Sequence, residues 1–212
     1  MPLTFPSHQG LILPLARKWP RHFDALALCV GAAMPDVVDG LLGLYRGHLG
    51  QWYGHTLVGT VVFCWPGGLI ITWLLIVVTR YLSLHFDSMR RILAVLAELA
   101  YPYRSKVDDA KTVVIRNRLV FVSVSIWIGT LSHLLWDFIS HGNYLLLYPL
   151  HENSQIFPSW WYAVWYEIPL PFYKDPYPFG PPVVVWIALT LLGALLFIRP
   201  VLRKIKKNAS LQ

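Results

Sequence analysis

The chain has 212 residues, enough for one domain. Hydrophobic residues make up 56% of it, charged residues only 14%, and the mean hydropathy is +0.49; a soluble domain carries about 25% charged residues. The formal net charge of +7 does not indicate nucleic-acid binding, because Lys and Arg gather at the ends of apolar runs. These features exclude a soluble nucleic-acid-binding domain and predict an integral membrane protein, an all-α bundle whose first partner is the lipid bilayer.

The N-terminal part predicts two short helices. The segments from His8 to Arg17 and from Phe23 to Met34 are apolar, but each is shorter than the ~20 residues that a full span needs. We therefore expect a short helical hairpin over residues 8–34, packed inside the bundle. Because the two helices run in opposite directions, His8 is expected near Asp36. The sequence leaves open whether this hairpin crosses the bilayer.

Three longer apolar runs predict transmembrane helices, over residues 56–79, 119–139 and 183–198. Within the first run, Pro66-Gly67-Gly68 predicts a kink. Two further segments connect the spans. Residues 86–100 combine charged and apolar side chains in the pattern of an interfacial amphipathic helix. Residues 142–182 form a proline-rich loop whose density of Trp and Tyr is typical of an interfacial belt or a lid.

Basic residues predict how the spans are oriented. If the spans alternate and the short hairpin crosses as well, the 18 Lys and Arg residues divide 16 to 2, with Arg46 and Lys174 on the minority side. If the hairpin does not cross, the basic residues outside it divide 13 to 2. Basic residues stay cytoplasmic. The C-terminus is therefore predicted to be cytoplasmic and the 142–182 loop to be non-cytoplasmic, in a multi-pass protein of the cell's inner (plasma) membrane.

One stretch, Leu131 to Asn143, carries the strongest chemical signal. His133, Asp137 and His141 are spaced four apart, so on a helix they lie on one face. An imidazole and a carboxylate one turn apart can bind a single divalent cation. The alternative is a polar stripe that hydrogen-bonds neighbouring helices. Ionisable groups at membrane depth are costly and tend to mark function, which favours the metal.

The predicted topology brings further polar residues to the same side of the membrane. His55 begins an inward span, whereas Asp137 ends an outward one, so both lie at the non-cytoplasmic face. Asp36 and Asp39 precede His55, and His8 joins them through the hairpin. Nitrogen and oxygen ligands without thiolate suit zinc, with manganese or iron as alternatives. Asp39 is expected either to cap a helix or to serve as the general base of a catalytic site.

The sequence also resembles a known family. Three motifs resemble those of an uncharacterised family of bacterial integral membrane proteins. In chain order they are PD, GHTL and GTLSHLLWDFISHG. That family is distantly similar to inner-membrane metal-dependent hydrolases and to the zinc phospholipase C and P1 nuclease group. Thr56 stands where the family's GHS motif has serine. The resemblance implies metal-ligand roles for His8, Asp36, His55, His133 and Asp137, followed by His141.

These observations lead to three hypotheses about function. The first is a metal-dependent hydrolase at the non-cytoplasmic face, acting on a lipid or another phosphoester through a metal-activated water. The second is a non-catalytic membrane scaffold with a structural metal. The third is an ion-coupled transporter, which needs a site near the midplane that is reachable from both sides. The clustering of polar residues at one face argues against the transporter.

Overall fold

The computed structural model describes residues 4–19, 22–46, 53–85, 113–141, 147, 157–169 and 176–209. Over these residues the chain is mostly helical, as predicted. The elements in chain order are α1 (Thr4–Lys18), α2 (Ala25–Gly31), α3 (Met34–Arg46), η1 (Tyr53–His55), α4 (Leu57–Gly59), η2 (Thr60–Cys64), α5 (Trp65–His85), α7 (Val113–His141), η4 (Ser159–Tyr162), β1 (Tyr166–Ile168), β2 (Tyr177–Phe179) and α8 (Pro181–Ala209).

Three segments of the described chain are long and apolar enough to cross a membrane. They are Leu57–Thr79, Leu119–Phe138 and Pro181–Arg199, close to the three spans predicted from the sequence. Helices α2 and α3 pass the same test as a pair that is bent by 40°, so they can form a fourth, broken span. The predicted amphipathic helix over residues 86–100 lies outside the described residues.

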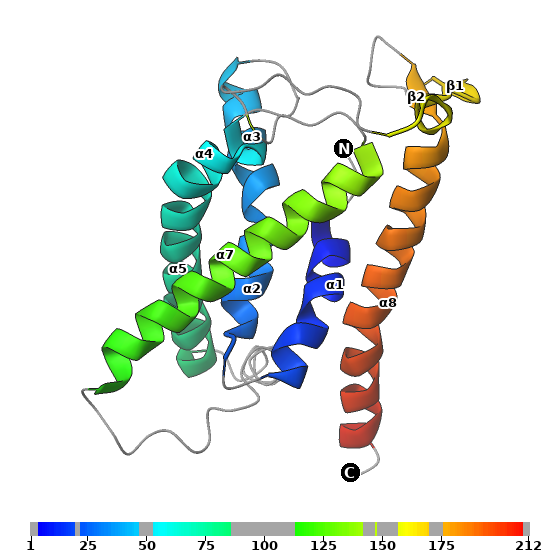
Figure 1. Cartoon of the computed structure of the whole chain (residues 1–212). Helices are drawn as coiled ribbons and strands as arrows, with labels where there is room; N and C mark the ends of the chain where they lie inside the picture. The colour runs from blue at the N-terminus through cyan, green and yellow to red at the C-terminus, as the bar shows by residue number, and fades with distance from the viewer. Residues whose placement is uncertain are drawn as a thin grey trace.

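The helices form a bundle that α7 crosses obliquely (Figure 1). Helix α1 packs between α2 and α8, and α7 packs on α2, α1, α5 and α8. Apolar side chains at the α1–α2 contact form a buried core of Ile12, Leu13, Ala16, Ala25, Leu28 and Ala32. The two short helices of the predicted hairpin are thus confirmed in kind, with bounds that differ by a few residues at each end.

Glycines allow two pairs of helices to approach closely. A Cβ atom added at Gly10 would overlap the backbone of Gly193, and one at Gly193 would overlap the backbone of Ser7, so α1 and α8 touch backbone to backbone. Gly31 of α2 and Gly129 of α7 are related in the same way, to Ile126 and Leu28 respectively. Small residues at helix contacts are typical of membrane bundles, where packing rather than hydrophobic burial drives association.

At the position of the kink predicted for Pro66, the structure has a π-helical turn just before the proline, within one continuous candidate span. Residues Thr60–Cys64 are π-helical, and the backbone N–H of Trp65 donates to the carbonyl of Thr60, five residues back. Pro66 has no N–H to give to Val62, and its ring would clash with that carbonyl in a regular α-helix. The widened turn accommodates the proline, and α5 continues from Trp65 to His85.

The expectation of an all-α fold needs one correction. Within the predicted 142–182 loop, Tyr166–Ile168 and Tyr177–Phe179 pair as a two-stranded antiparallel sheet, with Tyr166 opposite Phe179. Aromatic and β-branched residues favour strands, but strands of three residues are too short to produce a clear alternating pattern in the sequence. The four-residue 3₁₀ turn η4 precedes the sheet.

Candidate metal centre

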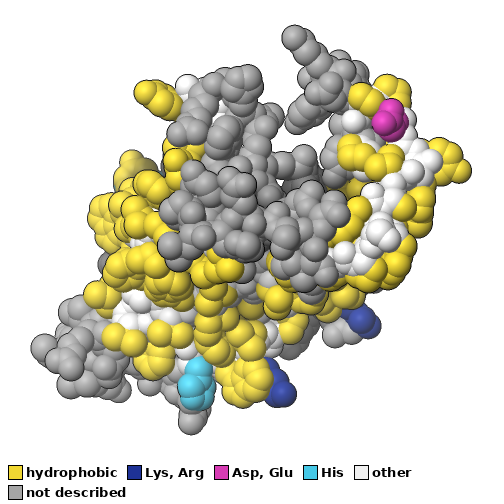
Figure 2. All heavy atoms as spheres, turned by 45° about the horizontal axis from the view of Figure 1, so that its top comes forward, with side chains coloured by type: hydrophobic (Ala, Val, Ile, Leu, Met, Phe, Trp, Pro, Cys, Tyr) yellow, Lys and Arg dark blue, Asp and Glu magenta, His cyan; other side chains and the backbone are white. Residues whose placement is uncertain are grey.

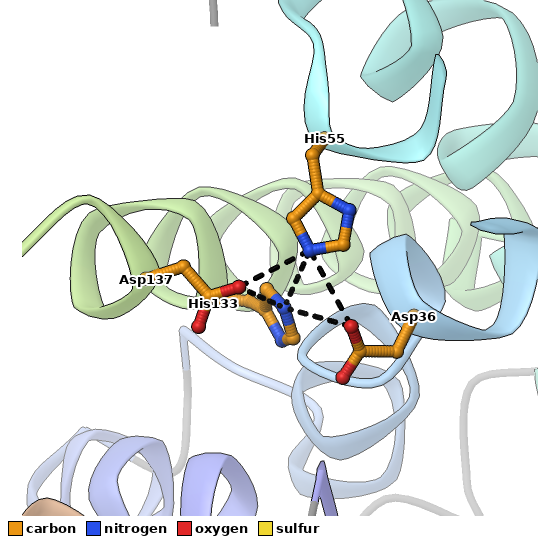
Figure 3. A group of neighbouring side chains, drawn as sticks. All are labelled: Asp36, His55, His133 and Asp137. Atoms are coloured by element: carbon orange, nitrogen blue, oxygen red, sulfur yellow. Dashed lines mark hydrogen bonds and ion pairs between the residues drawn. The ribbon is translucent and has the colours of Figure 1, made fainter. Parts of the chain in front are cut away.

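Four side chains from three separate elements converge on one point. Asp36 comes from the first turn of α3, His55 from the end of η1, and His133 and Asp137 from successive turns of α7 (Figure 3). Each offers one ligand atom, and all four atoms lie within 4.8 Å of one another. His55 and His133 are fully buried and Asp137 is buried, whereas the side chain of Asp36 is 17% exposed.

The spacing of the four atoms fits a small divalent cation. His55 Nε2 lies 3.3 Å from His133 Nε2 and 3.1 Å from Asp137 Oδ2. His133 Nε2 lies 3.3 Å from Asp137 Oδ2, and Asp36 Oδ1 lies 3.4 Å and 3.6 Å from the two Nε2 atoms. A tetrahedral ion with ligand bonds of about 2.0–2.2 Å has edges of about 3.3–3.6 Å. Four of the six edges therefore match, the edge from His55 to Asp137 is shorter at 3.1 Å, and the edge between the two carboxylates is at most 4.8 Å.

The orientation of His133 follows from the break between α2 and α3. Pro35 cannot donate a backbone hydrogen bond to the carbonyl of Gly31, which instead accepts from Thr130 Oγ1 at 3.1 Å. The next carbonyl, that of Ala32, lies 2.7 Å from His133 Nδ1. A carbonyl oxygen can only accept, so Nδ1 carries the proton and Nε2 presents its lone pair to the centre.

The Gly54-His55-Thr56 segment orients the second histidine. Asp39 Oδ2 lies 2.5 Å from His55 Nδ1, and the backbone N–H of Gly54 donates to Asp39 Oδ1 at 2.7 Å. A Cβ atom at Gly54 would overlap the carbonyl of Pro35, so this close approach requires glycine. Thr56 then caps α4, because its Oγ1 accepts from the N–H of Gly59 at 2.8 Å. His55 Nε2 is thereby directed at the centre.

The electrostatics of the centre favour a positive charge. Burial opposes protonation of His55, but the carboxylates of Asp137, Asp36 and Asp39 outweigh this effect and raise the pKa of His55 to about 11. Three carboxylates around one imidazole leave an excess of negative charge in a poorly solvated place, which is costly unless it is paired. A divalent cation satisfies that requirement and also separates the two Nε2 lone pairs.

His8 lies beside these four ligands. Its ring stacks on that of His133, with centroids 4.1 Å apart, and its Nε2 lies 3.6 Å from Asp137 Oδ1, the oxygen that faces away from His55. The side chain is 9% exposed. The structure therefore brings His8 from α1 to the edge of the centre, in contact with two of its members and outside the group of four.

The remaining predicted residues are placed differently. Asp39 is buried and contacts the outward nitrogen of His55, so it does not belong to the four converging ligand atoms. His141 is the last residue of α7, but its side chain is not among those that the structure describes. His48 lies outside the described residues. The carbonyl of Ala32 and the N–H of Gly54 could not be predicted from the sequence, because backbone groups carry no residue-type signal. Two sequence features could have indicated these groups: Pro35, which leaves a carbonyl without its helical donor, and the glycine directly before His55.

The expectation of an uncharacterised family is supported by one family model. Residues 1–163, which include all the residues of the centre, match the model of a domain of unknown function (DUF4184). The chain belongs to this family. No similarity to a curated protein or to a solved structure was found.

Proposed function

We propose that this protein is a membrane-embedded metalloprotein in which Asp36, His55, His133 and Asp137 bind one divalent cation. One observation carries the proposal: two Nε2 atoms lie 3.3 Å apart, while hydrogen bonds hold the Nδ1 proton of each ring away from the centre. Two lone pairs and two carboxylates that face one point repel one another unless a metal ion lies between them or His55 takes up a second proton, as its raised pKa allows in the metal-free protein. Donor atoms of this kind suit zinc first, then manganese or iron.

The reaction class that this centre supports best is metal-dependent hydrolysis at the non-cytoplasmic face. A bound divalent cation would lower the pKa of a coordinated water and polarise a phosphoryl or carbonyl oxygen. Asp36 is partly exposed, whereas the other three residues are buried, so the centre is least enclosed on the side of Asp36. The apolar helices around the centre favour a lipid or another amphiphilic phosphoester as the substrate.

A structural metal is the second candidate. Its support is that the four ligands come from α3, η1 and α7, so that an ion would join a broken helix, a short turn and a long oblique helix. A structural zinc site is closed by four protein ligands, whereas a catalytic one keeps a position for water or substrate. The same four residues are compatible with a structural and with a catalytic metal site, and the coordination number of the bound ion distinguishes the two.

Metal analysis of the purified protein tests the proposal. Protein extracted in mild detergent should contain about one divalent ion per chain by mass spectrometry. His133→Ala should lose the ion, whereas Asp24→Asn should keep it, because Asp24 caps α2 by accepting from the N–H of Ala27 and is not one of the four converging residues. Metal-free wild type that also fails to bind added Zn²⁺, Mn²⁺ or Fe²⁺ would refute a metal centre.

Substitution by cobalt and a substrate screen separate the two candidates. Four-coordinate and five-coordinate Co²⁺ differ in visible absorption, so addition of phosphate or of a short-chain phospholipid should change the spectrum of an open centre and leave a closed one unchanged. The loaded protein should then be assayed on phosphoester and lipid substrates. Turnover that is lost in His133→Ala supports the hydrolase; an unchanged spectrum without turnover supports the structural ion.

A further inference from the structure

The described residues between α7 and α8 form one unit, which we call the aromatic cap: residues 157–168 with residues 176–180. Strands β1 and β2 pair, and the N–H of Trp165 extends the pairing by donating to the carbonyl of Phe179 at 2.8 Å. Tyr162 Oη accepts from the N–H of Phe157 at 3.1 Å. A Cβ atom at Gly180 would overlap the carbonyl of Ala163, so the turn and the sheet touch directly.

The cap is attached to the ends of two candidate spans. Phe157 packs on Phe138, the last residue of the span in α7, with ring centroids 5.6 Å apart, and Trp161 stacks on Phe157 at 5.2 Å. At the other side, the N–H groups of Val183 and Val184 donate to the carbonyl of Gly180, so α8 begins where the cap ends. These contacts fix the height of the cap at the level where both spans leave the apolar layer.

The outer surface of the cap is apolar and aromatic. Trp160 is 61% exposed, Val164 55%, Trp165 54% and Tyr166 72%. Glu167 is the one charged residue of the cap. In Figure 2 the apolar side chains at the upper right continue down the molecule to its apolar flank, with an acidic group among them. Trp and Tyr combine an apolar body with a polar tip, and they concentrate at membrane–water interfaces for that reason.

We propose that the aromatic cap lies in the headgroup layer of the non-cytoplasmic leaflet and binds the lipid surface there. Its attachment to two span ends places it at that height, and its exposed side chains have the composition that this layer favours. Phe138 directly follows the ligand Asp137, so the cap also fixes the end of α7 that carries the centre. The proposal depends on membrane insertion and not on the presence of a metal or on catalysis.

Spin labels in nanodiscs of phosphatidylcholine and phosphatidylglycerol test this placement. In the full-length chain with Cys29→Ala and Cys64→Ser, single cysteines at Val164 and at Leu195 would carry the label; Leu195 is 65% exposed within the span of α8 and serves as the deep reference. Collision with oxygen, which concentrates in acyl chains, is compared with collision with a water-soluble nickel chelate. For the label at Val164, we expect the ratio of oxygen collisions to nickel-chelate collisions to lie between the ratio at Leu195 and that of the free label in water.

Two results would overturn the proposal. A label at Val164 that collides with the nickel chelate as freely as the label in water would place the cap outside the membrane. A label that is immobilised and shielded from both quenchers would indicate a protein partner or a second copy of this chain. The triple variant Trp160→Ser, Trp165→Ser and Tyr166→Ser should increase collisions of the Val164 label with the nickel chelate. Unchanged collision rates at Leu195 would show that the variant is folded. Metal content measured on the same samples keeps this test separate from that of the centre.

Discussion

At the scale of single residues, each histidine of the centre depends on a partner that binds its outer nitrogen. Asp39 holds His55, and the carbonyl of Ala32 holds His133. Such partners fix which ring nitrogen is free and how the ring is turned, and they raise the basicity of the ligand. We therefore assign Asp39 to positioning His55; the role of general base that its sequence context predicted is the alternative that the next experiment tests.

Asp39→Asn separates these two roles. If Asp39 positions His55, the affinity for Zn²⁺ should fall by about 10–100-fold, the usual effect of losing such a partner. The measurement is competition with a chelator of known affinity, and Asp24→Asn is the control. If affinity is unchanged in Asp39→Asn while turnover falls by ~10²–10⁴-fold, Asp39 is the base.

The hydroxyl of Thr56 has a structural role that can be isolated. Thr56→Ala removes the cap of α4 and should lower the free energy of unfolding by about 1 kcal/mol. Thr56→Ser keeps the oxygen that accepts from the N–H of Gly59 and should retain most of that stability. Thermal unfolding in detergent measures both variants. Equal melting temperatures for Thr56→Ala and wild type would show that the cap contributes nothing.

The convergence of the four residues of the candidate centre could be predicted from the sequence to a large extent, for identifiable reasons. His133 and Asp137 share a helical face, and the distribution of basic residues places His55 and Asp36 at the same end of the bundle. The contact between Asp39 and His55 could not be predicted, because an Asp in the first turns of a helix is equally compatible with a cap and with a general base. Only the fold shows that Asp39 reaches the far side of the His55 ring.

At the scale of elements, prolines determine where the helices break, and the breaks position the centre. Pro35 interrupts the path from α2 to α3 and leaves carbonyls for Thr130 and His133. Pro66 sets a π-turn one turn after His55. Both irregularities lie at a proline, because proline lacks an N–H. The sequence did not show that the second would be a widened turn instead of a sharp bend, since that depends on how neighbouring helices pack.

The contact between α1 and α8 predicts a strong effect of one added methyl group. In Gly193→Ala the new Cβ atom would overlap the backbone of Ser7, so the helices must separate. We expect a loss of stability of about 1–3 kcal/mol, as for overpacking of other tight interiors. Gly40→Ala is the matched control, since a Cβ atom there meets nothing within 4 Å. It should be neutral or stabilising. Thermal unfolding in detergent gives both values, and equal effects of the two substitutions would contradict this packing.

At the scale of the whole molecule, the distribution of charge predicts the orientation in the membrane. The division of 16 basic residues against 2 predicts that the cap is non-cytoplasmic and the C-terminus cytoplasmic. In a background without Cys29 and Cys64, cysteine at Ser159 should react with a membrane-impermeant maleimide in intact spheroplasts. Cysteine at Ser210 should react only after lysis. The opposite pattern would invert the topology.

The backbone contact between Gly10 and Gly193 also has a consequence for biosynthesis. His8 lies on α1, which precedes the other described helices in the chain, yet much of the surface on which α1 packs belongs to α8, which follows them. The N-terminal helix is too short to hold a place across the bilayer by itself. His8 is therefore expected to reach the centre only when translation of α8 is complete. A chain that stops before Pro181 should insert its earlier spans and remain accessible to a histidine-directed reagent at His8.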